Sequence, residues 1–297
     1  MPNTGPLSLA AAPLTPYGTP LDASQVRAMI DAAADAGFAG MSIDVAHHDW
    51  AVSDGMASEE FLEYHVARGL TIPAAEVILQ WASSDRAAAA DANTHILDVA
   101  ARAGANSVIA ATLESEVPSL SDAAARLAGL CDLAADRGLA ISYEFLPPTA
   151  IPDLATAARL LDAVDRDNFG LVLDTWHWFL QAGGPDPDTL RGVPPDRIHI
   201  LQINDAPSDI GQDWALATMS ARLLPGEGVV DIAELLGVLD EIGASPVIIT
   251  EVFSDELRSL GVAESARRQF AAGRAVLDAG ATRRAASSDA PAGRGSD

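Results

Sequence analysis

The stretch DIAELLGVLDEIGASPVIITEVF, residues 231–253, contains the structural unit that recurs along the chain. Its first half has an apolar stripe with the spacing of one helix face, formed by Ile232, Leu235, Leu236 and Leu239. Gly243 is expected to end that helix, because glycine readily adopts the left-handed conformation found there. The apolar run SPVIITEVF follows directly. A strand that is apolar on both faces and follows an amphipathic helix is typical of a parallel sheet covered by helices.

The same order of helix, glycine and strand recurs at Gly37, Gly69, Gly104 and Gly138. Eight strand candidates result: LSLAAA at 7, GMSIDV at 40, AEVILQW at 75, NSVIAAT at 106, LAISYEF at 139, FGLVLD at 169, RIHILQIND at 197 and SPVIITEVF at 245. Eight such units predict an α/β fold, a single-domain (β/α)8 TIM barrel. A doubly wound open sheet is the alternative, but no glycine-rich loop follows the first strand. We expect residues 1–280 to form the barrel and residues 281–297 to be a disordered tail.

Composition excludes several classes of function. The net charge of −24 argues against nucleic acid, and no apolar run is long enough for a membrane span. The amino end has no secretory signal, so the expected location is the cytoplasm. All 18 basic residues are arginines, which excludes lysine Schiff-base chemistry and a Walker-type phosphate loop. A general compositional bias of the source organism explains the absence of lysine equally well. Proton transfer is therefore expected from carboxylates or histidine.

Polar side chains end four consecutive predicted strands, namely Glu144, Asp174, Gln202 and Glu251. The carboxyl ends of barrel strands meet at the end of the barrel where active sites form. A carboxylate after an apolar run is costly unless it is paired, and a shared cation would offset that cost. This oxygen-only set favours one divalent ion, Mn²⁺ or Mg²⁺, with Co²⁺ as a further alternative. The alternative for any single acid is that it caps the next helix or pairs with arginine.

The motifs YEFLP, LDTWH, IHILQINDAP, RLLPGEGVVD and IITEVF, within residues 139–256, resemble the xylose isomerase-like barrel superfamily of sugar-phosphate isomerases and epimerases. Ketose 3-epimerases, hydroxypyruvate isomerase and inosose dehydratase belong to it. The first half of the chain matches only in its pattern of units. The resemblance implies that the four strand-end residues bind one metal ion. Gln202 departs from the histidine usual in epimerases, although hydroxypyruvate isomerase-like and dehydratase relatives tolerate glutamine there.

The resemblance also implies a reaction through an enediolate, with Glu144 and Glu251 as the catalytic proton carriers. His177 and Arg222 match residues that contact substrate in relatives. The expected function is thus an isomerase or epimerase of a keto sugar, cyclitol or related hydroxy-ketone, a small polyhydroxy carbonyl compound.

A dehydratase acting on an inosose or on a compound like 3-dehydroshikimate is the first alternative, because it requires only one further acid. The loop after the second strand offers His47 and His48 for that role, and Trp81 after the third strand is a further candidate for substrate binding. The second alternative is a barrel that serves as one subunit of a hetero-complex. A homo-oligomer is also compatible with the sequence.

Overall fold

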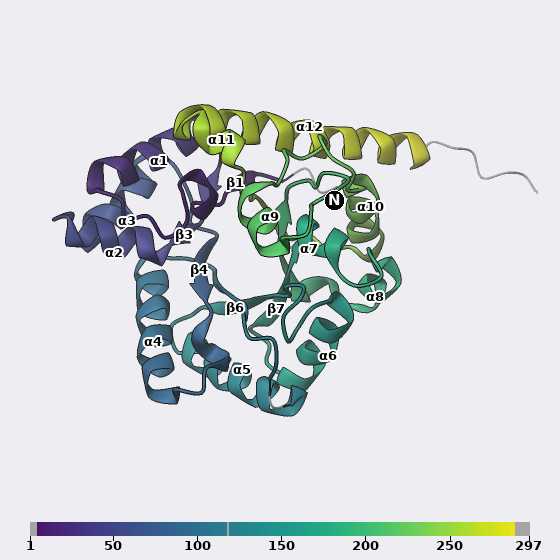
Figure 1. Cartoon of the computed structure of the whole chain (residues 1–297), viewed down its shortest axis with the longest axis horizontal. Helices are drawn as coiled ribbons and strands as arrows, with labels where there is room; N and C mark the ends of the chain where they lie inside the picture. The colour runs from purple at the N-terminus through teal and green to yellow at the C-terminus, as the bar shows by residue number, and fades with distance from the viewer. Residues whose placement is uncertain (1–4, 118, 289–297) are drawn as a thin grey trace, which may run out of the picture.

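The computed structural model describes residues 5–117 and 119–288, which form a closed barrel of parallel strands surrounded by helices (Figure 1). The strand order is β2-β1-β9-β8-β7-β6-β5-β4-β3, and every pair is parallel. β2 (Gly40–Met41) and β3 (Ile43–Asp44) are two parts of the predicted second strand, on either side of Ser42. Because β2 pairs with β1 and β3 pairs with β4, the sheet closes on itself, and the predicted eight-stranded TIM barrel is confirmed.

The remaining strands are β1 (Leu7–Leu9), β4 (Ala74–Ile78), β5 (Ser107–Ala110), β6 (Ala140–Glu144), β7 (Phe169–Asp174), β8 (Ile198–Ile203) and β9 (Val247–Thr250). The longer helices are α1 (Ala23–Ala36), α4 (Arg86–Arg102), α5 (Leu120–Ala135), α6 (Leu154–Val164), α10 (Ile232–Ile242) and α12 (Val262–Ser288). The shorter ones are α2 (Val45–Ser53), α3 (Ser58–Ala67), α7 (Thr175–Leu180), α8 (Pro187–Gly192), α9 (Trp214–Ser220) and α11 (Asp255–Ser259), with 3-10 turns η1 (Ala12–Leu14), η2 (Gln80–Ala82) and η3 (Pro195–Arg197).

Local sequence explains where the helices begin and end. Asp22 caps α1 by accepting a hydrogen bond from the backbone of Gln25, whose side chain accepts one in return from the Asp22 backbone. α10 has the apolar face expected from residues 231–253, and its apolar residues are buried against the barrel. Gly243 ends α10 at a φ of 77°, a conformation that costs glycine little.

Side chains inside the barrel form layers, because alternate residues of each strand point inward. One layer is an apolar cluster of Ala10, Ala74, Ile109, Val172, Ile200 and Ile249. Two residues further along the same strands come Ala12, Glu76, Ala111, Asp174, Gln202 and Glu251. The second layer therefore gathers acids and an amide at the carboxyl end of the barrel, above an apolar floor.

The tight packing below this floor depends on Gly170. A Cβ atom at Gly170 would lie 2.3 to 2.5 Å from three atoms of the His199 ring. Any residue larger than glycine would therefore clash with that ring. Ser142 on the neighbouring strand is hydrogen-bonded to Nδ1 of His199 at 3.0 Å. The interior is thus filled below the apolar layer, and open space remains at the carboxyl end.

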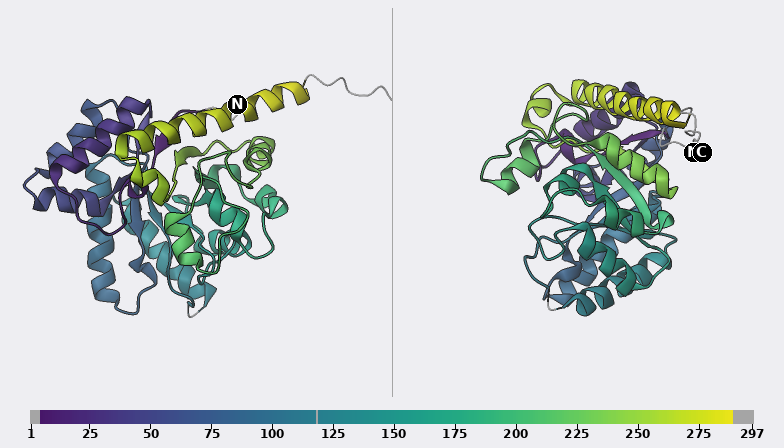
Figure 2. Two further views of the ribbon diagram at one scale, coloured as in Figure 1. Left: turned by 45° about the horizontal axis from the view of Figure 1, so that its top comes forward. Right: turned by 90° about the vertical axis from the view of Figure 1, so that its right-hand side faces the viewer.

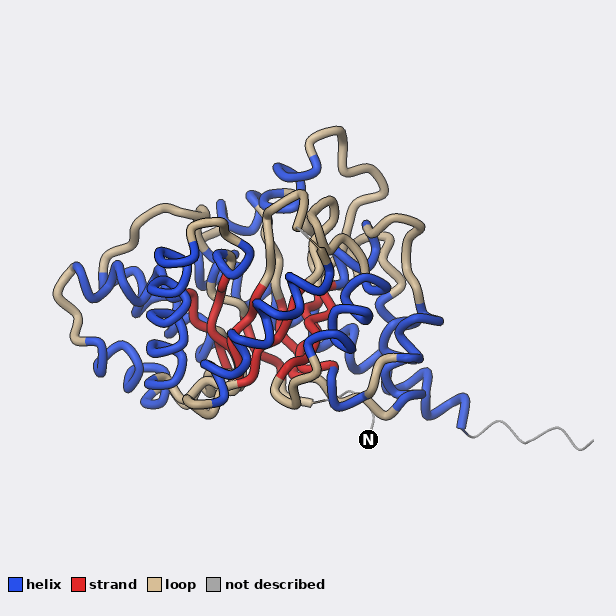
Figure 3. Tube along the Cα trace, turned by 90° about the horizontal axis from the view of Figure 1, so that it is seen from below, coloured by secondary structure: helices blue, strands red, loops and turns tan. Residues whose placement is uncertain are grey.

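The two ends of the barrel differ in their connections. Figure 3 shows long loops gathered at one end, with the amino end of the chain at the other. α12 packs beside α1 and extends beyond the body of the barrel (Figure 2). Because α12 is helical to Ser288, it passes the proposed domain boundary at residue 280, and the rest of the expected tail, 289–297, lies outside the described residues. Within the described chain, each helix is too short or too polar to cross a membrane.

Candidate active site

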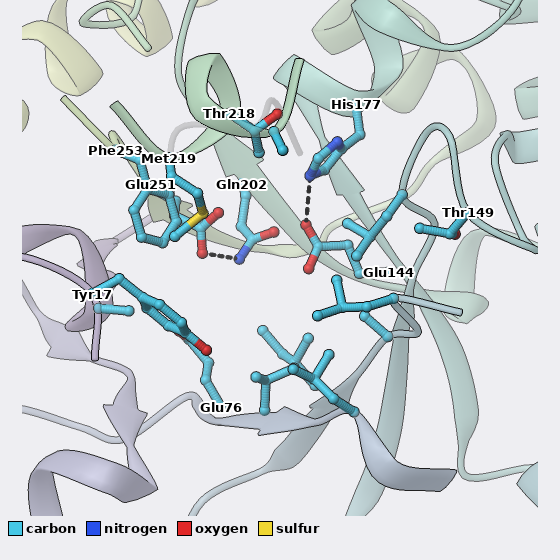
Figure 4. Close-up of a pocket in the computed structure, with 18 of the residues that line it drawn as sticks. Tyr17, Glu76, Glu144, Thr149, His177, Gln202, Thr218, Met219, Glu251 and Phe253 are labelled. Carbon is cyan, nitrogen blue, oxygen red and sulfur yellow. Dashed lines mark hydrogen bonds and ion pairs between the residues drawn. The ribbon is translucent and has the colours of Figure 1, made fainter. Parts of the chain in front are cut away.

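A cavity of about 380 Å³ opens at the carboxyl end of the barrel (Figure 4). Four acids line it, namely Asp44, Glu76, Glu144 and Glu251. Arg222, His177, Gln202 and Trp214 also reach it, while much of the remaining wall is apolar. Three of the four predicted metal ligands therefore face one cavity, together with both predicted second-half substrate contacts.

Glu251 and Glu144 flank Gln202 across this cavity (Figure 4). The side-chain amide of Gln202 donates a hydrogen bond of 2.7 Å to Oε1 of Glu251, which fixes both side chains. Oε1 of Glu144 lies 3.5 Å from Nε2 of His177. Within the described residues, Glu144 accepts no hydrogen bond, so its carboxyl group is available to a ligand.

Asp174 lies behind the cavity wall and is fully buried. Nη1 of Arg222 donates to Asp174 at 2.8 Å and to Oε2 of Glu251 at 3.0 Å, and the side chain of Asn204 donates to both Asp174 oxygens. Asp174 also caps α7 by accepting from the backbone of Trp176. Both alternatives considered for a strand-end acid, a helix cap and an arginine pair, are thus present at Asp174.

Burial changes the protonation of these groups. It raises the pKa of Glu144 to about 8, with a further contribution from the charge of Asp174. It also raises the pKa of Glu251 well above its usual value, although Arg222 acts in the opposite direction. Burial alone would raise the pKa of Asp174 too, but the Arg222 guanidinium holds it below its usual value. One arginine therefore keeps Asp174 ionised, whereas the raised pKa values of Glu144 and Glu251 favour the protonated forms of both glutamates.

His177 is buried beside the acids, at the first helical turn after β7. Burial lowers its pKa to about 3, so the imidazole is neutral near neutral pH. Its ring lies 5.9 Å from the Trp214 ring, and its Nδ1 has no hydrogen-bond partner among the described residues. A neutral imidazole can either bind a metal ion or form a hydrogen bond with a ligand oxygen.

The donor set fits a divalent cation. Glu144, Asp174 and His177 each place one possible ligand atom within 4.8 Å of the others. Oε1 of Gln202 is buried and has no hydrogen-bond partner among the described residues. A buried amide oxygen without a partner is costly, and a bound cation would offset both this cost and the repulsion between the glutamates. These residues therefore form a candidate metal site.

Three residues predicted to bind substrate do not line the cavity. His48 is buried between Ser58 and Asp49, to which its ring nitrogens are hydrogen-bonded at 2.8 and 2.9 Å. His47 is buried on α2, with Nε2 lying 3.9 Å from Asp44. The Trp81 indole donates to the backbone oxygen of Ala111. The structure places these side chains in the packing of the first-half helices, because α2 and η2 direct them away from the opening.

Other residues at the cavity were not identified from the sequence as functional candidates. Glu76 lies within a predicted strand rather than at its end, and its signal was an isolated acid in the run AAEVIL. Asn204, which holds Asp174, comes two residues after Gln202 and so points to the same side of the chain. Trp214 gives no comparable signal, because it begins a short helix in a polar loop.

Comparison with known proteins agrees with this architecture. The family model described as Xylose isomerase-like TIM barrel matches residues 30–279. The chain therefore belongs to the xylose isomerase-like TIM barrel family.

Individual relatives are more distant. Inosose isomerase of Bacillus subtilis (strain 168) is 32% identical over 143 residues, which cover 47% of this chain and 49% of the relative. The chain spans about half the length of the inosose isomerases it matches. A 3-dehydroshikimate dehydratase of Pseudomonas putida is 29% identical over 134 residues, 45% of this chain and 21% of that protein.

The crystal structure of an IolI protein with a bound zinc atom shares the fold. It has a TM-score of 0.80, is 21% identical, and the match covers 93% of this chain and 99% of that one. The zinc atom belongs to that protein, and the similarity to this chain is one of fold.

Proposed function

We propose that this chain is a divalent-metal-dependent isomerase or epimerase that acts on a neutral keto sugar or cyclic keto-polyol. One observation carries the proposal: Glu144 and Glu251 face the same cavity on either side of Gln202, above an apolar floor. Two carboxyl groups so arranged can remove a proton from a carbon on one side and return it on the other. Which glutamate acts first stays open.

The metal ion would be held by the candidate ligands Glu144, Asp174, Gln202 and Glu251, with His177 beside them. When bound, a divalent ion polarises a substrate carbonyl and stabilises the enediolate that forms on loss of a proton. We expect Mn²⁺ or Mg²⁺, with Co²⁺ as a further possibility, from the oxygen-rich set. The zinc of the related IolI structure makes Zn²⁺ a necessary member of any metal panel.

Two side chains are available to orient the substrate. Trp214 lines the cavity, and its buried indole N–H has no hydrogen-bond partner among the described residues, so we infer that it donates to a substrate oxygen. His177 offers a ring nitrogen near Glu144. Arg222 touches the cavity, but its guanidinium lies against Asp174 and Glu251 and between the Trp176 and Phe253 rings, so it mainly positions those acids.

The charges of the wall favour a neutral substrate. Among the described residues that line the cavity, Arg222 is the one permanently cationic side chain, and it is already paired with two acids. A phosphate or carboxylate group would therefore meet Asp44, Glu76, Glu144 or Glu251 without a free partner. The similarity to inosose isomerase supports the same class, since an inosose is an uncharged cyclic ketone.

The test is hydrogen exchange from solvent. Protein loaded in turn with Mn²⁺, Mg²⁺, Co²⁺ and Zn²⁺ is incubated in deuterated water with ketoses, inososes and 3-dehydroshikimate. We expect deuterium at the carbon next to the carbonyl of an uncharged substrate, and a loss of roughly 10²–10⁴-fold in Glu144→Gln and Glu251→Gln. Glu227→Gln, at an exposed residue outside the cavity, is the control. Turnover at the parent rate in both active-site variants would refute the assignment.

A dehydratase is the second candidate, because one relative is a 3-dehydroshikimate dehydratase and both reactions begin with the same enediolate. Release of a conjugated enone in the same experiment distinguishes it from an isomerase. The further alternative, a barrel subunit of a hetero-complex, predicts that the isolated chain is inactive. Activity of the purified chain alone would exclude that alternative.

A further inference from the structure

Glu76 is a buried acid of the cavity that the proposed isomerase reaction does not use. It belongs to the same inward-facing layer as Asp174, Gln202 and Glu251, but it comes from β4 in the first half of the barrel. Its side chain is directed toward the cavity beside Tyr17, on the side away from His177 (Figure 4). It is not a member of the close group of ligand atoms formed by Glu144, Asp174 and His177. Glu76 therefore lies on a different side of the cavity from that group (Figure 4).

The hydrogen bonding of Glu76 leaves one of its oxygens available. Ser42 donates from its hydroxyl to Oε1 of Glu76, and within the described residues no donor reaches Oε2. A proton on the carboxyl group is thus expected on Oε2, because Oε1 already accepts a hydrogen bond. Ser42 holds the side chain in place while the other oxygen can meet a ligand.

The surroundings of Glu76 favour its protonated form. The residue is 6% exposed, and burial raises its pKa to about 7; the bond from Ser42 acts against this shift and the charge of Asp44 adds to it. Tyr17 lies beside it, and a charge on Glu76 would raise the pKa of Tyr17, Glu144 and Glu251. The neighbouring wall from β4 and β5, including Val77 and Ile109, is apolar. Within the described residues, no basic side chain forms an ion pair with Glu76.

We propose that Glu76 is a general acid for a second reaction of this cavity, the loss of water from a substrate with a hydroxyl group on the carbon beyond the enediolate. The inference rests on the proposed function, because it uses the same enediolate. Glu144 or Glu251 takes the proton from the carbon next to the carbonyl. As the carbonyl re-forms, a carbon–carbon double bond forms, the carbon–oxygen bond to the hydroxyl breaks, and Glu76 gives its proton to the leaving oxygen. The products are an unsaturated ketone and water, and solvent restores both carboxyl groups.

Glu76 takes the role of the dehydration acid, for which two histidines were considered from the sequence. His47 and His48 lie outside the cavity lining, whereas Glu76 is part of it. Glu76 also stands apart from the close ligand group. A separate acid can protonate the leaving oxygen while the base still holds the carbon proton, and the position of Glu76 provides such an acid.

The experiment follows two signals from one incubation of Mn²⁺-loaded protein with an inosose in deuterated water: deuterium exchange at carbon and appearance of the conjugated enone. We expect Glu76→Gln to keep the exchange rate within about 2-fold and to lose enone formation by roughly 10²–10⁴-fold. Glutamine can still accept the bond from Ser42, so the variant should fold. Glu76→Asp, which keeps a carboxyl group, should recover part of the enone signal, and Glu227→Gln should change neither signal.

Three results would overturn the inference. The first is equal loss of exchange and of enone in Glu76→Gln, which would assign Glu76 to binding or to the first proton step. The second is unchanged enone formation in Glu76→Gln. The third is exchange by the wild-type protein with no enone from an inosose, which leaves the proposed isomerase intact. Absence of exchange by the wild-type protein would instead refute the proposed function, and with it the intermediate shared by both reactions.

Discussion

The two halves of the barrel's carboxyl end hold their acids in different ways. In the second half, Asp174 and Glu251 share Arg222, and Asn204 and Gln202 complete a network of charged and amide groups. In the first half, Glu76 has one bond from Ser42, and Asp44 beside it adds repulsion. Burial is similar on both sides, so the difference lies in the available partners. Asp174, which accepts from both Arg222 and Asn204, keeps a lowered pKa, whereas burial raises the pKa of Glu251 despite Arg222 and raises that of Glu76 to about 7.

The largest expected effect comes from removing the partner in the second half. We expect Arg222→Met to lower the free energy of unfolding by about 3–5 kcal/mol near pH 7, because Asp174 and Glu251 would be left buried without their cation. Urea denaturation of the metal-free protein measures this change. Arg191→Met is the control: Arg191 is paired with Glu241 and Asp188 but is 41% exposed, so about 1 kcal/mol or less is expected. Equal losses in both variants would show that burial does not separate the two kinds of pair.

The sequence predicted the site residues of the second half of the barrel better than those of the first half. In the second half, each polar residue comes at the end of an apolar strand, as with Asp174 after GLVL, and such a position is visible without coordinates. The barrel itself was predictable because the helix, glycine and strand unit recurs. In the first half, Glu76 lies inside its strand. It faces the cavity because it comes two residues after Ala74, whose side chain belongs to the apolar layer inside the barrel. His48 is polar and close in sequence to a strand end, yet α2 turns it toward Ser58.

Metal binding provides the next test of this comparison, because all the candidate metal ligands come from the second half of the barrel. A divalent ion at about 100 times its dissociation constant stabilises the folded state by about 2.7 kcal/mol. We expect Mn²⁺ to raise the melting temperature of the wild-type protein, and Gln202→Leu to reduce that increase, because Oε1 of Gln202 is a buried acceptor without a partner among the described residues.

Gln269 offers a matched control for this metal test. It is also a buried glutamine whose Oε1 lacks a partner in the described structure, but it lies on α12, outside the cavity. Gln269→Leu should therefore keep the full response to Mn²⁺, as measured by thermal unfolding with metal and with a chelator. A response that is the same in both variants would remove Gln202 from the candidate ligands.

The first half should differ in how its stability depends on pH. The pKa of Glu76 is raised from 4.5 to about 7 in the folded protein, so its protonated form contributes stability that is present below the unfolded value and is lost as pH rises through about 7. Relative to Glu76→Gln, we expect metal-free wild-type protein to lose on the order of 2 kcal/mol between pH 5 and pH 8. Urea denaturation at each pH measures the difference. A constant difference across this range would mean that Glu76 does not titrate there.

The smallest expected effect concerns two tryptophans that the sequence does not distinguish by function. The Trp81 indole donates to the backbone of Ala111 inside the packing, whereas Trp214 lines the cavity and its buried indole N–H has no partner among the described residues. Trp81→Phe should cost about 1 kcal/mol of stability for the lost hydrogen bond and leave KM unchanged. Trp214→Phe should instead change stability little and raise KM severalfold, because the donor it removes is free to meet substrate. Steady-state kinetics and thermal unfolding of both variants decide between these outcomes, and the reverse pattern would place the substrate against the first half of the barrel at Trp81.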